Sequence, residues 1–133
     1  MIFNILLWFL VILLAVLITG LFKYQIIAVG SGSMEPNISY GDAIIFEKFK
    51  DDYKYYELKV GDIIVFRHNN DMIVHRILSI TYTSDDISVE TKGDHNENKD
   101  SYVLHKKDIL GKFDIKIKYI GTPTLWLRDI FNK

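Results

Sequence analysis

Residues 29–37, with the sequence VGSGSMEPN, combine hydroxyl groups with unusual backbone freedom. Ser31 and Ser33 alternate with glycines, and Pro36 follows closely. Glycine permits backbone conformations closed to other residues, while proline fixes its own φ and favours an extended residue before it. A hydroxyl held on such a turn is exposed in the way that a nucleophilic serine requires. An ordinary Gly/Ser-rich loop has the same composition, so this segment alone does not establish catalysis.

A serine hydroxyl becomes a good nucleophile only when a neighbouring base takes its proton, and His75 is the candidate for that base. It lies within the apolar residues 73–77, where a titratable side chain interrupts the pattern. An imidazole with an ordinary pKa of about 6.5 suits proton transfer at neutral pH. The alternative is a histidine that only contributes to the packing of a strand.

Residues 92–100, which we call the acidic loop, contain several carboxylates. One of them can supply the negative charge that such a base needs to fix its tautomer. Asp94 and Asp100 are the two candidates in this loop. Acidic and amide residues alternate here as they do in a calcium-binding loop, but Lys99 and His105 occupy the positions where that motif needs Gly and Glu. A turn rich in Asn and Asp between two strands remains the structural alternative.

The composition argues against several other chemistries. The chain of 133 residues has no cysteine, which excludes disulfides, thiolate metal sites and a cysteine nucleophile. A net charge of −1 provides no basic surface for nucleic acid. His95 and His105 have acidic neighbours but lack the spacing of a zinc site. We therefore expect neither a metal ion nor an organic cofactor.

Residues 1–22 contain no charged side chain, and residues 5–18 are apolar without interruption. A helix of this length would measure about 33 Å, enough to cross a bilayer core of about 30 Å. A cleavable signal peptide would need a positive N-terminal region and a small-x-small exit, and a buried core helix would normally have a polar stripe. We therefore predict an uncleaved transmembrane anchor over residues 1–22, followed by a catalytic domain over residues 23–133.

The pattern of residues 23–133 predicts a mainly β domain, a barrel-like or folded sheet of six or seven short strands. Gly-Asp turns precede two of the strands, and a hairpin-like turn is expected over residues 68–71. A short C-terminal helix should begin with Thr122 as N-cap and Pro123 in the first turn. Four residues should share one face of this helix and pack in the core: Trp126, Leu127, Ile130 and Phe131. The predicted strands cover residues 24–29, 43–46, 63–66, 72–80, 87–91 and 115–119.

Four segments, together with the N-terminal helix, resemble the type I signal peptidases of the archaeal and endoplasmic-reticulum kind over residues 1–121. They are SGSMEP at residues 31–36, VGDIIVF at residues 60–66, VHRI at residues 74–77, and KGDHN at residues 92–96 followed by Asp100. The histidine at position 75 separates this chain from the bacterial relatives, which have a lysine there.

The resemblance implies Ser33 as the nucleophile and His75 as the general base. It implies that Asp94 and Asp100 both matter, with Asp100 favoured as the partner of His75. The Ser31 hydroxyl and the Ser33 backbone N–H are the implied oxyanion donors. His95 departs from the Asn that is common in the family, and only 18 residues lie between His75 and Asp94. The extra β domain of many bacterial relatives is therefore absent between them.

The implied function is a membrane-anchored serine endopeptidase that removes signal peptides from exported preproteins through an acyl-enzyme. Its expected partners are signal peptides, the lipid bilayer, and a translocon or accessory subunits, with the catalytic domain on the extracytoplasmic side of the membrane. The peptide is expected to add as a strand between residues 26–33 and 72–75, with small side chains entering shallow pockets. The alternatives are a catalytically inactive anchored scaffold and a self-cleaving repressor-type peptidase, which would carry a lysine base and a DNA-binding segment.

Overall fold

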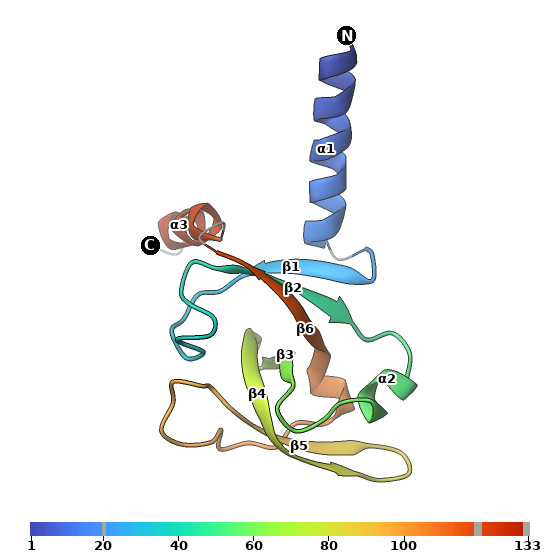
Figure 1. Cartoon of the computed structure of the whole chain (residues 1–133), viewed down its shortest axis with the longest axis vertical. Helices are drawn as coiled ribbons and strands as arrows, with labels where there is room; N and C mark the ends of the chain where they lie inside the picture. The colour runs from blue at the N-terminus through green and yellow to red at the C-terminus, as the bar shows by residue number, and fades with distance from the viewer. Residues whose placement is uncertain (20, 119–120, 132–133) are drawn as a thin grey trace.

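The computed structural model describes residues 1–19, 21–118 and 121–131, and these form one antiparallel sheet with flanking helices. Figure 1 shows helix α1 standing away from the sheet and helix α3 lying beside the end of β1. The mainly β fold expected from the sequence is thus confirmed. The elements in chain order are α1 (Ile2–Thr19), β1 (Tyr24–Ala28), β2 (Ala43–Lys48), α2 (Tyr53–Tyr56), β3 (Ile63–His68), β4 (Asp71–Tyr82), β5 (Ile87–Lys92), the 3₁₀-helix η1 (Lys106–Asp108), β6 (Ile109–Ile117) and α3 (Thr122–Phe131).

The sheet has the strand order β1-β2-β6-β3-β4-β5 and curls strongly. Register shifts interrupt the ladders β2–β6, β3–β6 and β4–β5, and such irregularities bend a sheet. Gly111 lies at the tightest point, because a Cβ there would come within 1.9 Å of the Glu47 carbonyl oxygen. The chain therefore requires glycine at this position of β6.

The turns use the chemistry that the sequence predicts. Asn69 and Asn70 join β3 to β4 with φ values of 49° and 70°, the left-handed conformation of a tight two-residue hairpin. The two Gly-Asp turns are alike: each glycine has a positive φ, and the following aspartate accepts a hydrogen bond from the backbone N–H three residues earlier. The same local solution therefore starts β2 and β3.

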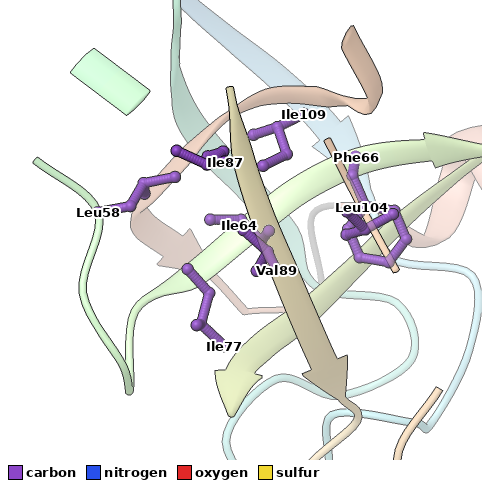
Figure 2. Close-up of a cluster of buried hydrophobic side chains, with 8 residues drawn as sticks. All are labelled: Leu58, Ile64, Phe66, Ile77, Ile87, Val89, Leu104 and Ile109. Carbon is purple, nitrogen blue, oxygen red and sulfur yellow. The ribbon is translucent and has the colours of Figure 1, made fainter. Parts of the chain in front are cut away.

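Two hydrophobic clusters hold the sheet, and alternate residues of β3 supply each of them. Ile64 and Phe66 point into the first cluster, while Val65 points into the second. The second cluster also takes Met34 and Ile38 from the loop between β1 and β2. Figure 2 shows the first cluster, which consists of Leu58, Ile64, Phe66, Ile77, Ile87, Val89, Leu104 and Ile109.

The N-terminal helix corrects one prediction. It has 18 residues and ends at Thr19, before the boundary expected at Phe22. Within the described ranges, no helix has both the length and the apolar character that crossing a bilayer requires. The transmembrane span predicted for residues 1–22 is therefore not supported by the structure.

The C-terminal helix forms as predicted, but its expected packing face is wrong. Leu125 is buried, whereas Leu127, Ile130 and Phe131 are exposed. The Trp126 side chain lies outside the described residues. The largest difference in strand bounds is in β6, which begins at Ile109 instead of residue 115. Gly111 and charged residues break the alternation along β6, which hid its first half.

Leu104→Ala tests the first cluster. Leu104 is 1% exposed, and its backbone bridges to Val89. Removing its side chain from a packed core should lower the free energy of unfolding by about 2–5 kcal/mol, measured by urea unfolding. Val103→Ala is the matched control, because Val103 is 47% exposed and its truncation should change stability by about 0.5 kcal/mol or less. Equal losses in the two variants would contradict this assignment of the core.

Candidate active site

The loop between β1 and β2 holds Ser33 by anchoring the residues around it. The base of the loop is closed by hydrogen bonds from Val29 N to the Asp42 carbonyl (2.8 Å) and from Gly41 N to the Val29 carbonyl (2.9 Å). Met34, next to the serine, is buried in the second cluster, and so is Ile38. Burial of these apolar side chains holds a loop that would otherwise be mobile, so the Ser33 hydroxyl has a defined position.

His75 lies on β4 and its side chain reaches the serine loop. The ring is buried, and its Nε2 lies 3.1 Å from Ser33 Oγ. The Phe66 ring packs against the imidazole in an edge-to-face arrangement, at a centroid distance of 6.0 Å. A hydroxyl and an imidazole from segments 42 residues apart are thus in hydrogen-bond contact.

Asp100 is the carboxylate that contacts the imidazole. Its Oδ2 lies 2.7 Å from His75 Nδ1 and also accepts a hydrogen bond of 2.6 Å from the Thr91 hydroxyl. Because a carboxylate accepts hydrogen bonds, this contact requires the proton on Nδ1 and leaves Nε2 able to accept the proton of Ser33. The backbone N–H of Asp100 donates to the Thr91 carbonyl, which fixes the loop end against β5.

Asp94 occupies a different place from Asp100. Its two carboxylate oxygens accept hydrogen bonds of 2.8 and 2.7 Å from the Arg76 guanidinium, and Asn37 donates a third at 2.7 Å. The Arg76 hydrogen bonds hold the pKa of Asp94 below its usual range, and the hydrogen bond from Asn37 lowers it further. Asp94 in turn raises the pKa of Arg76. This carboxylate therefore ties the acidic loop to β4 and to the serine loop.

The acidic loop also lies directly against the backbone of the serine. His95 N donates a 2.9 Å hydrogen bond to the Ser33 carbonyl. A Cβ at Gly93 would come within 2.5 Å of that same carbonyl oxygen, so only glycine permits this approach. The His95 backbone, and not its imidazole, thus makes the contact with Ser33.

Ser31 extends the chain of polar groups, since its Oγ lies 3.1 Å from Ser33 Oγ. The five side chains Ser31, Ser33, His75, Asp100 and Thr91 therefore form a continuous series of contacts. The first four were predicted as site residues, and Thr91 was missed. Thr91 is fully buried and follows Ile87 and Val89 on the inward face of β5. A hydroxyl at an inward position of an apolar strand was the signal that could have found it.

A cleft of about 470 Å³ leads to Ser33 between the end of β1 and the start of β4. Backbone edges face it from both elements: β1 pairs only with β2 among the described strands, and β5 joins β4 only from Arg76 onward. The lining combines apolar side chains with the polar Ser31, Ser33, Asp71 and Arg128, and it consists of residues 27–31, Ser33, Met34, residues 71–74 and Arg128. An extended chain would find unpaired backbone groups on both walls.

The residues considered for metal or calcium binding are dispersed. Asp94 contacts Arg76 and Asp100 contacts His75, so the alternating acids of the loop point to different partners. His105 contacts Asp86 instead, at 2.9 Å. Across the described part of the chain, no three His, Asp or Glu side chains gather as a ligand set.

Comparison with known proteins matches the chain to one family and to several curated relatives. Residues 2–103 match the family described as signal peptidase, peptidase S26. The chain is 34% identical over 114 residues to the human signal peptidase complex catalytic subunit SEC11C, covering 78% of this chain and 57% of that protein. It is also 34% identical over 95 residues to signal peptidase I W of Bacillus subtilis (strain 168), and this match covers 71% of this chain and 48% of that protein. The chain thus spans about half the length of these curated relatives.

Arg76→Gln tests the attachment of the acidic loop. A lowered folded pKa of Asp94 means that its stabilisation is present above the unfolded value of about 3.9 and is lost as the pH falls through the folded value. The variant should be less stable at pH 7 by about 1–2 kcal/mol in urea unfolding, a modest amount because the Arg76 side chain is 33% exposed. The difference should diminish below about pH 4.

Arg67→Gln serves as the control, because it removes the same charge from an exposed position on β3. An NMR titration provides an independent measurement, in which the pKa of Asp94 should be higher in Arg76→Gln than in the unmodified chain. An unchanged Asp94 titration would contradict the proposed coupling.

Proposed function

Since the chain belongs to the signal peptidase family, peptidase S26, we propose that it is a serine endopeptidase that removes signal peptides from exported preproteins. The observation that carries the proposal is the continuous contact from Ser33 through His75 to Asp100. Nucleophile, base and orienting acid are the three parts that acyl transfer by a serine needs. The matching segments in sequence order support the same assignment.

In the proposed reaction, Ser33 Oγ attacks the carbonyl carbon of the scissile peptide bond while its proton moves to His75 Nε2. The tetrahedral intermediate then collapses, His75 gives that proton to the leaving amine, and the amino-terminal part of the substrate remains as an ester on Ser33. Water repeats the sequence with His75 as base and releases the signal peptide. Asp100 stabilises the imidazolium that forms in both halves, and Thr91 orients Asp100.

We assign stabilisation of the oxyanion to the Ser33 backbone N–H and the Ser31 hydroxyl. The Ser31 hydroxyl lies 3.1 Å from the nucleophile, which supports a position near the developing charge. Donors fixed before the reaction stabilise the transition state more than the ground state. Asp94 is proposed to act indirectly: with Arg76 and Asn37 it keeps residues 93–96 against the Ser33 carbonyl.

The substrate is proposed to bind as an added strand in the cleft between β1 and β4. The unpaired edges on both walls support this mode, because they can hydrogen-bond an extended backbone of any sequence. Side chains of such a strand alternate between two faces. Small residues near the cut, as the family resemblance implies, would suit a cleft walled in part by Ala28 and Gly30.

Substitutions in a processing assay test these roles. With a secretory precursor in detergent micelles, Ser33→Ala and His75→Ala should each lower the cleavage rate by at least about 10³-fold. Asp100→Asn should cost about 10³–10⁴-fold, because the base loses its orienting charge. Ser31→Ala should lower kcat by about 10²-fold. Sequencing of the product N-terminus identifies the bond that is cut.

Asp94→Asn is the matched comparison for Asp100→Asn, since both remove one charge from the same loop. We expect the smaller effect from Asp94→Asn, because it contacts Arg76 and not the base. A larger loss from Asp94→Asn would move the orienting role to that residue. Near-unmodified cleavage by His75→Ala would refute the proposed base. An unmodified chain that cleaves no precursor would favour the inactive-scaffold alternative.

We further propose that α1 attaches the domain to an export membrane, with the catalytic domain on its extracytoplasmic side. Large apolar side chains of α1 are exposed, including Leu6, Trp8 and Phe9 at 62–66%. An exposed apolar surface of this size favours transfer into lipid. Such attachment would bring Ser33 to the membrane from which signal peptides emerge and raise their effective concentration. Accessory subunits stay a prediction; the human relative is named as the catalytic subunit of a signal peptidase complex.

Liposome flotation tests the attachment. The unmodified chain should float with the vesicles, while a full-length chain carrying Phe9→Asp and Leu13→Asp should stay in the bottom fraction, because charges oppose insertion of α1. Val103→Asp is the control, as it adds a charge at an exposed position outside α1 and should float normally. Flotation of the doubly charged variant would refute attachment through α1. Digestion of the domain by a protease added outside intact cells tests whether the domain lies on the extracytoplasmic side of the membrane.

A further inference from the structure

Helix α3 presents an unusual face to the sheet. Gly121 directly precedes the helix, and Leu125 and Arg128 follow it at helical spacings of four and three residues, so the three lie on one side. Gly121 N donates a 3.0 Å hydrogen bond to the Gly41 carbonyl, and a Cβ at Gly121 would come within 2.7 Å of the Asp42 carbonyl oxygen. Leu125 is 3% exposed. These two contacts therefore hold the N-terminal part of the helix against the sheet, on the same side as Arg128.

Arg128 occupies the next position of this packed stripe, where an apolar residue would ordinarily continue it. The apolar Leu127, Ile130 and Phe131 are instead exposed. The Arg128 guanidinium covers the backbone of Gly30: a Cβ at that glycine would lie 2.7 Å from Arg128 Nη1 and 3.5 Å from Leu125 Cδ2. A cation from α3 is thus held three residues before the Ser33 nucleophile.

The guanidinium also lies where two cavities meet. Arg128, Ile27 and Ala28 line both the cleft that leads to Ser33 and a second cavity of about 550 Å³. The second cavity is mainly apolar and is bounded by α1, β1 and α3, the last of which lies beside β1 in Figure 1. A peptide that continued from the cleft into this cavity would lie beside the residues that line both, Arg128 among them.

The charges of the cleft are few. Among the described residues that line it, Arg128 is the one basic side chain and Asp71 is the one acidic side chain. A guanidinium stays protonated at every physiological pH and only donates hydrogen bonds. Its natural ligand on a peptide is therefore a carboxylate, whereas a lysine or arginine at the same point is repelled.

We propose that Arg128 is a specificity-determining residue, which favours an acidic and disfavours a basic side chain at one position of the bound peptide. The inference rests on the proposed function, because it takes the cleft between β1 and β4 as the peptide site. Attraction at an exposed position is modest and is screened by salt. The difference in affinity should accordingly be clear between a peptide with an acidic residue and one with a basic residue at this position. It should be small between either of these and a peptide with a neutral residue there.

Peptide binding to the full chain with Ser33→Ala, in neutral detergent micelles, tests the proposal. The probes are fluorescent peptides derived from an uncharged segment of a precursor. In each peptide, Glu, Gln or Lys replaces one residue before the scissile bond, and every position is substituted in turn. At one position Glu should bind about three- to tenfold more tightly than Lys. Arg128→Glu should invert this preference at the same position, so that Lys binds more tightly than Glu. Arg128→Lys should keep the preference for Glu. High salt should reduce it.

Arg67→Gln is the matched control and should leave every ratio unchanged, because Arg67 does not line the cleft. Circular dichroism and the unfolding midpoint establish that Arg128→Glu is folded. The same Glu/Lys ratios in the unmodified and Arg128→Glu chains would overturn the proposal, and so would the absence of binding by any peptide. Cleavage by the chain with Ser33 intact tests the proposed function separately, so a preference without cleavage, or cleavage without a preference, distinguishes the two failures.

Discussion

The contact between the Ser33 hydroxyl and the His75 imidazole depends on holding a loop at a fixed distance from a strand. The two residues are 42 positions apart, and their side chains meet at 3.1 Å. Ordering a loop costs about 1–2 kcal/mol of backbone entropy per residue, so a loop with exposed polar groups alone would not stay there. Burial of Met34 and Ile38 offsets that cost, which makes the hydrophobic cluster beneath the loop part of the site.

The acidic loop stabilises the same contact from the other side through two carboxylates with different partners. Asp100 faces inward, where Thr91 and His75 share one of its oxygens. Asp94 faces the rim, where Arg76 and Asn37 bind it. Gly93 lets the loop between them touch the Ser33 carbonyl. One short segment thereby contacts both the His75 imidazole and the Ser33 backbone, through carboxylates that have different partners.

The open edges of the sheet and the placement of α3 belong together. An unpaired strand edge invites pairing with other chains, and the end of β1 and the start of β4 both present such edges to one cleft. The bulges that curl the sheet bring these edges to face each other, although β1 and β4 are not neighbours in it. Helix α3 packs beside β1 and adds a single cation to the cleft wall.

The sequence by itself determined the mainly β fold and the turn positions, because these depend on local patterns. The four residues of the polar chain from Ser31 to Asp100 were implied by its resemblance to a known family. The family resemblance favoured Asp100 over Asp94 as the partner of His75, and the tertiary structure has Asp100 in contact with His75 and Asp94 in contact with Arg76. The face that α3 buries and the first half of β6 were also decided by tertiary packing. Burial against distant neighbours outweighs local periodicity there: Gly111 and Gly121 fit where backbones approach closely, and no pattern in their own segments records that approach.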